Sequence, residues 1–316
     1  MTPRLRRRAL LSGALAGGLL AAGCARTPVG AEAIRIGYQR SGVLLLAKAR
    51  GRLPERLGRP VQWIEFPSGP PLMEALAAGA VDFGAVGDAP PLFAQAARVA
   101  FVYVARQPVT GAGSALLVPP GSAVGSVADL RARRIAFTKA TSAHLFTHFA
   151  LRQAGLRLAD VTQVHLSPGD AAAAFRSGQF DAWATWDPYY ALAVRDQGAR
   201  VLLTGEGLPL TNGFYLASRR FAEHAPDRLS ALLTALKGEA EWGVAHVDEV
   251  SGVVSDATGL PRDIVQAALR RGPFAVAPLD AETMAAQQDA ADAFLEIGAL
   301  PARIDVTEAV WSGWDG

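Results

Sequence analysis

"AFRSGQFDAWATWDPYY" (residues 174–190) has the same layout as "ALAAGAVDFGAVGDAPP" (residues 75–91). In each stretch a helix-like segment ends at a glycine, an aspartate follows three residues later, and a short apolar run leads to a second aspartate. Asp82 thus corresponds to Asp181. An apolar run between a glycine and a polar exit is typical of a strand that follows a helix. The two stretches therefore predict the same helix–strand unit twice.

A second pair of stretches recurs at the same offset. "RIGYQR" (35–40) and "RIAFTK" (134–139) each have a basic residue, a strand-like apolar segment and polar residues after it. One such match could arise by chance, but two at a common offset indicate a duplicated unit. The period of roughly a hundred residues is too long for a solenoid repeat and suits a domain.

Each unit predicts the order strand, helix, strand, helix, strand. Gly79 and Gly178 stand where a helix end favours a positive φ. In the first unit we expect strands at 34–39, 61–66 and 82–85, with helices at 43–57 and 71–78. In the second we expect strands at 134–137, 161–166 and 182–185, with helices at 142–154 and 168–176. Alternating strands and helices predict parallel sheets covered by helices on both faces.

The chain crosses between the two units twice. We assign 34–118 to the first lobe, 119–211 to the second, and 212–316 to a return into the first lobe. The return begins with a strand at 212–221 and continues with helices at 227–245, 261–271 and 280–296. The fold class is therefore a two-lobed α/β protein with mostly parallel sheets. A ligand cleft is expected between the lobes, at the carboxyl ends of the strands.

The first 24 residues have the pattern of an export signal. A basic start containing Arg7 and Arg8 precedes an apolar run and small residues before Cys24. The arginine pair fits twin-arginine export, although an ordinary secretory signal fits nearly as well. Cys24 is the single cysteine of the chain, so it forms no internal disulfide. The ending "LAAGC" resembles a lipobox, which implies lipidation of Cys24 and anchoring of the exported protein.

Composition excludes several classes of function. Residues 1–24 hold four arginines and no acidic residue, so the rest of the chain carries 27 basic and 29 acidic residues, a net charge of −2. No basic tract remains to bind nucleic acid. His144 and His148 have a spacing compatible with a metal, with His165 as a third candidate, but we expect no metal and no cofactor. No Walker A loop, Gly-x-Ser-x-Gly motif or cysteine nucleophile is present.

The chain resembles the aliphatic-sulfonate-binding proteins of ABC importers over nearly its whole length after residue 34. The resemblance is carried by "IGYQRSG", "WIEFPSGPPLMEAL", "GAVDFGAVGDAPPLFAQAA", "DAAAAFRSGQFDAWATWDPYYA" and "RRGPFAVAPLDAETMAAQQ". It implies the type II periplasmic-binding fold and capture of a small solute, by a monomer, for a permease and an ATPase. Receptors for taurine, nitrate and thiamine precursors are similar, as are thiamine-precursor synthases, which leaves an enzyme as the alternative class.

A sulfonate is an oxyanion, which backbone N–H groups at helix N-termini bind well. The loop containing Gln39, Ser41 and Gly42 provides one such start, and the loop containing Thr141, Ser142 and His144 provides another. Thr141 and Ser142 are equally well explained as ordinary N-caps. The related proteins often have glycine and asparagine where this chain has Ala140 and Ser142, and a hydroxyl residue where it has Val86.

Two aspartates and two tryptophans complete the candidate site. Asp88 and Asp187 each precede a proline-containing helix start, which favours a capping role for both. If Asp88 faces the ligand instead, an amine on the ligand would suit it. Trp183 and Trp186 point to opposite faces of a strand, so we assign Trp183 to the core and Trp186 to the cleft. Further candidates are Gly87, which would let backbone approach the ligand, and Phe214 on the returning strand.

Overall fold

The computed structural model describes residues 33–209, 212–272 and 274–316. Cys24 and the whole predicted export signal lie outside the described residues. Within the described ranges, no helix is long and apolar enough to cross a membrane.

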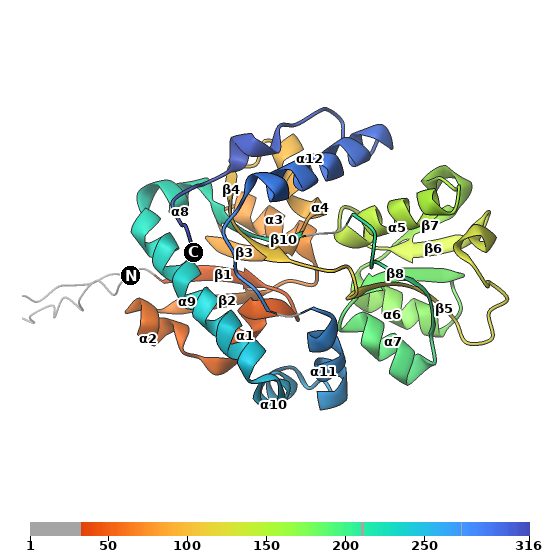
Figure 1. The fold of residues 1–316 in the computed structure, drawn as a ribbon, viewed down its shortest axis with the longest axis horizontal. Coiled ribbons are helices and arrows are strands. Elements are labelled where there is room, and N and C mark those ends of the chain that lie inside the picture. Colours follow the sequence, from red (N-terminus) through yellow and green to blue (C-terminus); the bar gives the residue numbers. More distant parts are fainter. Residues whose placement is uncertain (1–32, 210–211, 273) are drawn as a thin grey trace, which may run out of the picture. The chain divides into compact units, whose positions relative to one another are not determined.

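The first lobe is built on a five-stranded sheet with the order β2-β1-β3-β10-β4 (Figure 1). Strands β1, β2 and β3 are parallel, and β10 runs antiparallel between β3 and β4. The strands are β1 (Ile34–Tyr38), β2 (Val61–Glu65), β3 (Phe83–Gly87), β4 (Phe101–Pro108) and β10 (Asn212–Ser218).

The second lobe repeats this arrangement with the order β7-β6-β8-β5-β9 (Figure 1). Here β5 is the antiparallel strand, paired with β8 and β9. The strands are β5 (Ser114–Val118), β6 (Arg134–Phe137), β7 (Thr162–His165), β8 (Ala182–Trp186) and β9 (Arg200–Thr204). The two-lobed α/β fold is thus confirmed. The predicted boundary after residue 118 is wrong, because β5 belongs to the second sheet and the chain crosses between Pro108 and Ser114.

The internal repeat is visible in matching side-chain contacts. The N–H and Nε of Arg35 both donate to Oδ2 of Asp82, at 2.9 and 3.0 Å. In the second lobe the N–H and Nε of Arg134 donate to Oδ2 of Asp181, at 2.8 and 3.3 Å. Each arginine also reaches the carbonyl of the glycine with positive φ that follows the preceding helix. The layout that the two stretches share therefore gives each lobe an arginine–aspartate contact, which links its first strand to the start of its third strand.

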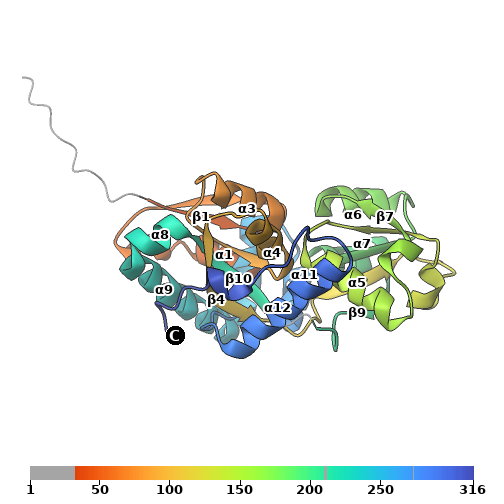
Figure 2. The same cartoon turned by 90° about the horizontal axis from the view of Figure 1, so that it is seen from above.

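Helices cover both faces of each sheet (Figures 1 and 2). The predicted helix at 43–57 is wrong as one element, because Gly51 adopts φ 66° and separates α1 from α2. The predicted strand at 212–221 ends at Ser218, whose hydroxyl caps α8. The helices are α1 (Gly42–Arg50), α2 (Leu53–Leu57), α3 (Gly69–Ala77), α4 (Ala89–Ala96), α5 (Ser142–Gln153), α6 (Pro168–Arg176), α7 (Tyr189–Gln197), α8 (Arg219–His224), α9 (Pro226–Ala245), α10 (Val247–Thr258), α11 (Arg262–Arg271) and α12 (Ala281–Glu296).

Alternating side chains of β10 separate the core into two faces. Phe214 packs with α3, α4 and α12, whereas Tyr215 packs with α1 and α9. On the α1–α9 side, Glu239 is fully buried and its Oε2 lies 2.8 Å from Nη1 of Arg50. The Arg50 guanidinium lies 3.4 Å from the Trp242 ring centre. A charged pair is therefore built into the packing of α1 against α9.

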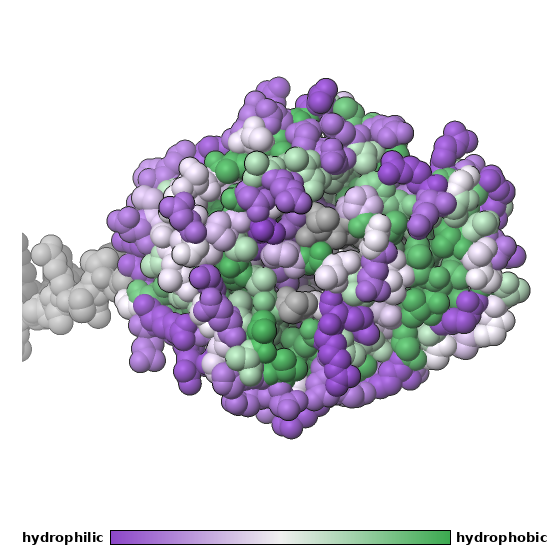
Figure 3. Space-filling model, viewed as in Figure 1, coloured by the Kyte–Doolittle hydropathy of each residue, from purple (hydrophilic) through white to green (hydrophobic). Residues whose placement is uncertain are grey.

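The face seen in Figure 3 mixes hydrophilic and hydrophobic residues, and the hydrophobic ones gather most over the second lobe at the right. Among the described residues the exposed large hydrophobic side chains are Val194, Val244 and Val247. Scattered apolar residues of this kind are ordinary on a protein surface.

Candidate functional site

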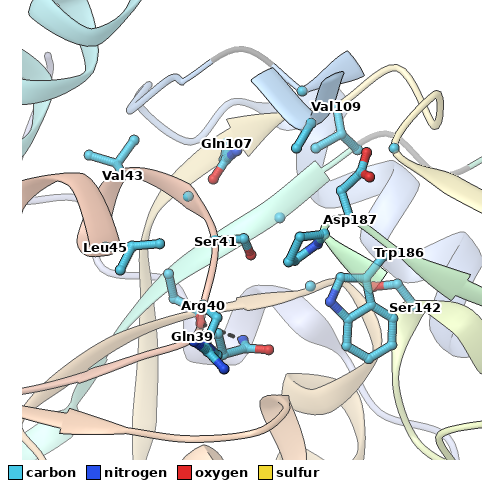
Figure 4. Close-up of a pocket in the computed structure, with 18 of the residues that line it drawn as sticks. Gln39, Arg40, Ser41, Val43, Leu45, Gln107, Val109, Ser142, Trp186 and Asp187 are labelled. Carbon is cyan, nitrogen blue, oxygen red and sulfur yellow. Dashed lines mark hydrogen bonds between the residues drawn. The ribbon is translucent and has the colours of Figure 1, made fainter. Parts of the chain in front are cut away.

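A cavity of about 280 Å³ lies between the two sheets, where the strands of both lobes end (Figure 4). Nine of the eleven predicted ligand-binding residues line it: Gln39, Ser41, Gly42, Gly87, Asp88, Thr141, Ser142, Trp186 and Asp187. They come from the ends of β1, β3 and β8 and from the loop after β6. Side chains and backbone of both lobes therefore face one shared space.

Several helices of both lobes begin at this cavity, and α1, α4 and α5 are three of them. Ser41 is the N-cap of α1, Asp88 precedes α4, and Thr141 is the N-cap of α5. Neither Ser41 nor Thr141 makes a side-chain capping bond, and the Thr141 hydroxyl donates to the Thr138 carbonyl at 2.6 Å. The positive ends of three helix dipoles therefore converge on the polar half of the cavity, which favours an anion there.

The two lobes meet at Gly87 and Ser142. A Cβ atom on Gly87 would lie 2.0 Å from the Ser142 Oγ, closer than any real contact allows. A side chain at this position would displace the Ser142 hydroxyl, so glycine at the end of β3 leaves room for that hydroxyl at the start of α5.

Gln39 and Arg40 form the wall on the side of the first lobe. The Gln39 side-chain amide donates to the Ala85 carbonyl at 3.1 Å (Figure 4). Arg40 donates through Nη2 to the Thr258 carbonyl at 2.6 Å, and its Nε lies 3.9 Å from Glu65. Both side chains therefore have hydrogen-bond partners within the first lobe.

The capping role predicted for Asp88 is wrong. Its side chain makes no capping bond, because Pro90 and Pro91 occupy the positions whose N–H groups a cap would need. The carboxyl group is buried, and Oδ1 has no hydrogen-bond partner among the described residues. Burial raises the pKa of Asp88 to about 6, partly offset by hydrogen bonds from Ser142 and from the Ala89 N–H.

Asp187 does more than the predicted cap. Its Oδ1 accepts the Ala191 N–H at 3.3 Å, within the first turn of α7. Both oxygens also accept from Arg271, through Nε and Nη2, each at 2.7 Å. Arg271 lines the cavity and was not singled out in the sequence, although it lies in the quoted "RRGPF" stretch. It is the last residue of α11 and does not follow a strand, so the sequence pattern gave no signal for it.

The two tryptophans lie as the strand alternation predicts. Trp183 is almost fully buried and packs on Phe175, with ring centres 5.6 Å apart. Trp186 is half-buried, lines the cavity and meets Tyr189 edge-on at 6.4 Å. Figure 4 shows the Trp186 indole beside Ser142, so an aromatic wall stands next to the start of α5.

His144 and Phe214 do not line the cavity. His144 stacks on Phe137 at 4.9 Å and contacts Phe294 at 5.2 Å, and burial lowers its pKa to about 4. Phe214 is buried against Tyr103, with ring centres 5.0 Å apart. Both side chains pack in the core that α4, α5 and α12 share.

The other half of the cavity is apolar. Its walls come from α1, the α10–α11 region and the segment after α11: Val43, Leu44, Leu45, Val254, Leu260, Val265, Ala268, Leu269 and Phe274. A polar half with helix N-termini beside an apolar half suits a small amphiphile with an anionic head.

This fold and cleft define a two-lobed substrate-binding protein. The family model described as "ABC transporter, phosphonate, periplasmic substrate-binding protein" matches residues 45–255. The chain belongs to this family of periplasmic substrate-binding proteins of ABC transporters.

Within the family, the resemblance to aliphatic-sulfonate-binding proteins is confirmed. The chain is 38% identical to a putative aliphatic sulfonates-binding protein of Escherichia coli (strain K12), over 89% of each chain. It is 34% identical to a protein of the same description from Bacillus subtilis (strain 168), over 88% of this chain and 85% of the relative. The solved structure of the alkanesulfonate-binding protein SsuA from Xanthomonas axonopodis pv. citri bound to MOPS is 42% identical. It superimposes with a TM-score of 0.86 over 89% of this chain and 99% of that one.

Proposed function

We propose that this protein captures aliphatic sulfonates outside the cytoplasmic membrane and delivers them to an ABC permease and its ATPase. The observation that carries the proposal is the division of one cavity into an anion-binding half and an apolar half. The kinship with sulfonate-binding proteins supports it. The protein acts by binding, as a monomer, and not as an enzyme.

The sulfonate head lies among the helix starts of both lobes. Its three oxygens accept hydrogen bonds from N–H groups at the start of α1 and α5 and from the hydroxyl of Ser41, while the Ser142 hydroxyl donates to Asp88. The wall also contains two carboxyl groups, of which Asp187 is paired with Arg271 and Asp88 is not paired with a cation among its described contacts. Such a wall favours a monoanion, such as a sulfonate, over a dianion.

Trp186 forms the wall for the first methylenes of the ligand's chain. We expect Trp186→Ala to weaken hexanesulfonate binding by about 1–3 kcal/mol, through lost apolar contact. Isothermal titration calorimetry of the folded variant measures this change. Trp183→Ala is the matched control: it should destabilise the protein by roughly 3–5 kcal/mol and leave the affinity of the remaining folded protein nearly unchanged. The reverse pattern would show that the two indoles have been assigned to the wrong roles.

A thermal-shift panel tests the ligand class itself. Hexanesulfonate, taurine, nitrate and a thiamine-type pyrimidine should be compared, since a ligand that binds only the native state raises the melting temperature. We expect the alkanesulfonate to give the largest shift. A larger shift with one of the other three would replace the proposed ligand by that one.

The export signal and lipid anchor are part of the proposal. Cys24 becomes the lipidated N-terminus after cleavage, which holds the protein at the outer face of the cytoplasmic membrane. We expect Cys24→Ser to move the protein from the membrane fraction to the soluble envelope fraction. A serine variant that partitions like the wild type would remove the anchor from the proposal and leave the ligand untouched.

A further inference from the structure

Helix α11 is attached to the second lobe at both of its ends. In its first turn, Asp263 accepts from Nη1 of Arg195 on α7, at 2.9 and 3.2 Å. In its last turn, Arg271 makes the two 2.7 Å bonds to Asp187 and lies 4.1 Å from the ring centre of Tyr190. Figure 1 shows α11 beside α7, at the junction of the two sheets.

The chain that leads into α11 packs on the first lobe. Helix α10 belongs to the core that contains α1 and α9. The turn between α10 and α11 is held by the Ser255 hydroxyl, which donates to the Leu260 carbonyl at 2.6 Å. Arg262, the first residue of α11, packs over Gly252 of α10. Helix α11 is thus carried by one lobe and bound by the other, so it spans the cleft.

The face of α11 between these two attachments is part of the apolar half of the cavity. Val265, Ala268 and Leu269 line it, at the three- and four-residue spacing that places side chains on one face of a helix. The position of α11 therefore decides whether the apolar half is closed on this side.

We propose that α11 is the lid over the ligand's alkyl chain and that Arg271 is the positioning residue that holds it shut. The proposal rests on the proposed function, because it assumes that an apolar chain occupies this half of the cavity. Arg271 acts through Asp187 and α11, and it sets how strongly the protein favours long chains over short ones.

The two attachments differ in strength. The side chains of Arg195 and Asp263 are 35% and 64% exposed, and an ion pair that exposed contributes little. The side chains of Arg271 and Asp187 are 25% and 10% exposed and form two parallel bonds. Stacking on Tyr190 adds a contact that lysine cannot reproduce. Arg271 is therefore the dominant attachment.

The experiment compares the effect of chain length on affinity in wild type and in Arg271→Gln. Dissociation constants are measured by calorimetry for ethane-, butane-, hexane- and octanesulfonate. In the wild type each methylene that enters the apolar half should strengthen binding by about fourfold. In Arg271→Gln this factor should fall below about twofold. The Asp187 carboxylate that loses its partner would weaken all four ligands by one common factor, which does not alter the dependence on chain length.

Three variants make the result specific. Asp187→Asn removes the same attachment from the other side and should flatten the chain-length dependence in the same way. Arg271→Lys should restore it only in part. Arg270→Gln, which removes an exposed neighbouring charge from the same helix, should leave it unchanged. Circular dichroism and melting curves confirm that each variant is folded.

The alternatives give different outcomes. If Arg271 contacted the sulfonate directly, all four ligands would weaken by the same factor and the chain-length dependence would persist, which would overturn the lid. An unchanged set of affinities would overturn it as well. If the wild type bound none of the four sulfonates, the proposed function itself would fail. That result is distinguishable, because it is seen before any variant is made.

Discussion

Glu239→Ala is expected to lower the free energy of unfolding by about 3–5 kcal/mol. The carboxylate is fully buried between α9 and α1, and its partner Arg50 has only 6% of its side chain exposed. Arg56 lies within ion-pair distance of the other oxygen, at 3.4 Å. Removing the carboxylate leaves the Arg50 charge buried without compensation, which costs far more than the pair contributes when intact. Chemical denaturation measures the loss.

Two controls separate this effect from surface electrostatics. Glu241 lies on the same helix, is 67% exposed on its side chain and pairs with Lys237. Glu241→Ala should therefore change stability by less than about 0.5 kcal/mol. Replacing Glu239 and Arg50 together with leucine should recover much of the loss, because no uncompensated charge remains. If the free energy of unfolding of Glu239→Ala were within about 1 kcal/mol of the wild-type value, the Arg50 charge would be solvated by water and not buried without compensation.

Asp88→Asn is expected to stabilise the protein at pH 8 by about 3 kcal/mol. Burial raises the pKa of Asp88 to about 6, from 3.8 in an exposed carboxyl group. The native state therefore binds this proton more tightly than the unfolded state does. The wild type loses stability as the pH rises from about 4 to about 6, at about 1.4 kcal/mol for each pKa unit of difference. Asparagine carries no charge and escapes this loss.

The test is the pH dependence of the difference between the two proteins. The stabilities should coincide near pH 4, diverge through pH 6 and stay apart above it. Asp256→Asn, at an exposed position on α10, should show no such divergence. A constant difference at all pH values would mean that Asp88 keeps its ordinary titration.

The same variant examines the ligand. Asparagine removes a negative charge from the cavity wall, so hexanesulfonate should bind Asp88→Asn more tightly by about 1–2 kcal/mol at pH 8. Taurine should gain less, since its amine would lose a carboxylate neighbour. A wild type that prefers taurine, and loses the preference in Asp88→Asn, would make an aminosulfonate the ligand.

The repeat could be predicted from the sequence because the same local constraints act in both lobes. Gly79 and Gly178 both adopt φ 69°, and each is followed by an aspartate that bonds the first strand of its own lobe. These contacts join elements of the same lobe, so a short stretch of sequence contains most of what is needed to predict the repeated unit.

Strand β5 could not be assigned in the same way. It is contributed to the second sheet by chain that has just left the first lobe, and its apolar pattern does not identify the sheet with which it pairs. The returning strand β10, in contrast, was expected in the first lobe and lies there. The Arg271–Asp187 contact joins residues 84 positions apart, so no local sequence pattern predicts it.

Two other findings could have been drawn from the sequence. The prolines at positions 90 and 91 already exclude N–H donors to an Asp88 cap. The family resemblance implies a glycine at the place of Ala140, and Ala140 adopts the left-handed φ of 59° that glycine tolerates best. The turn is thus retained without the glycine, and α5 still begins at the cavity.

The chain leaves the first lobe after β4 and returns to it at β10, and these two points lie close together. The Gly205 N–H donates to the Ser114 carbonyl at 3.0 Å, so the two ends of the second lobe lie side by side. In the first lobe, Pro108 and Asn212 are register partners of β4 and β10. Residues 114–204 therefore form a cassette, and a short turn in its place would join β4 and β10 as a hairpin. The second lobe is in this sense an exchangeable insert, through which one scaffold could present a different half of the cleft.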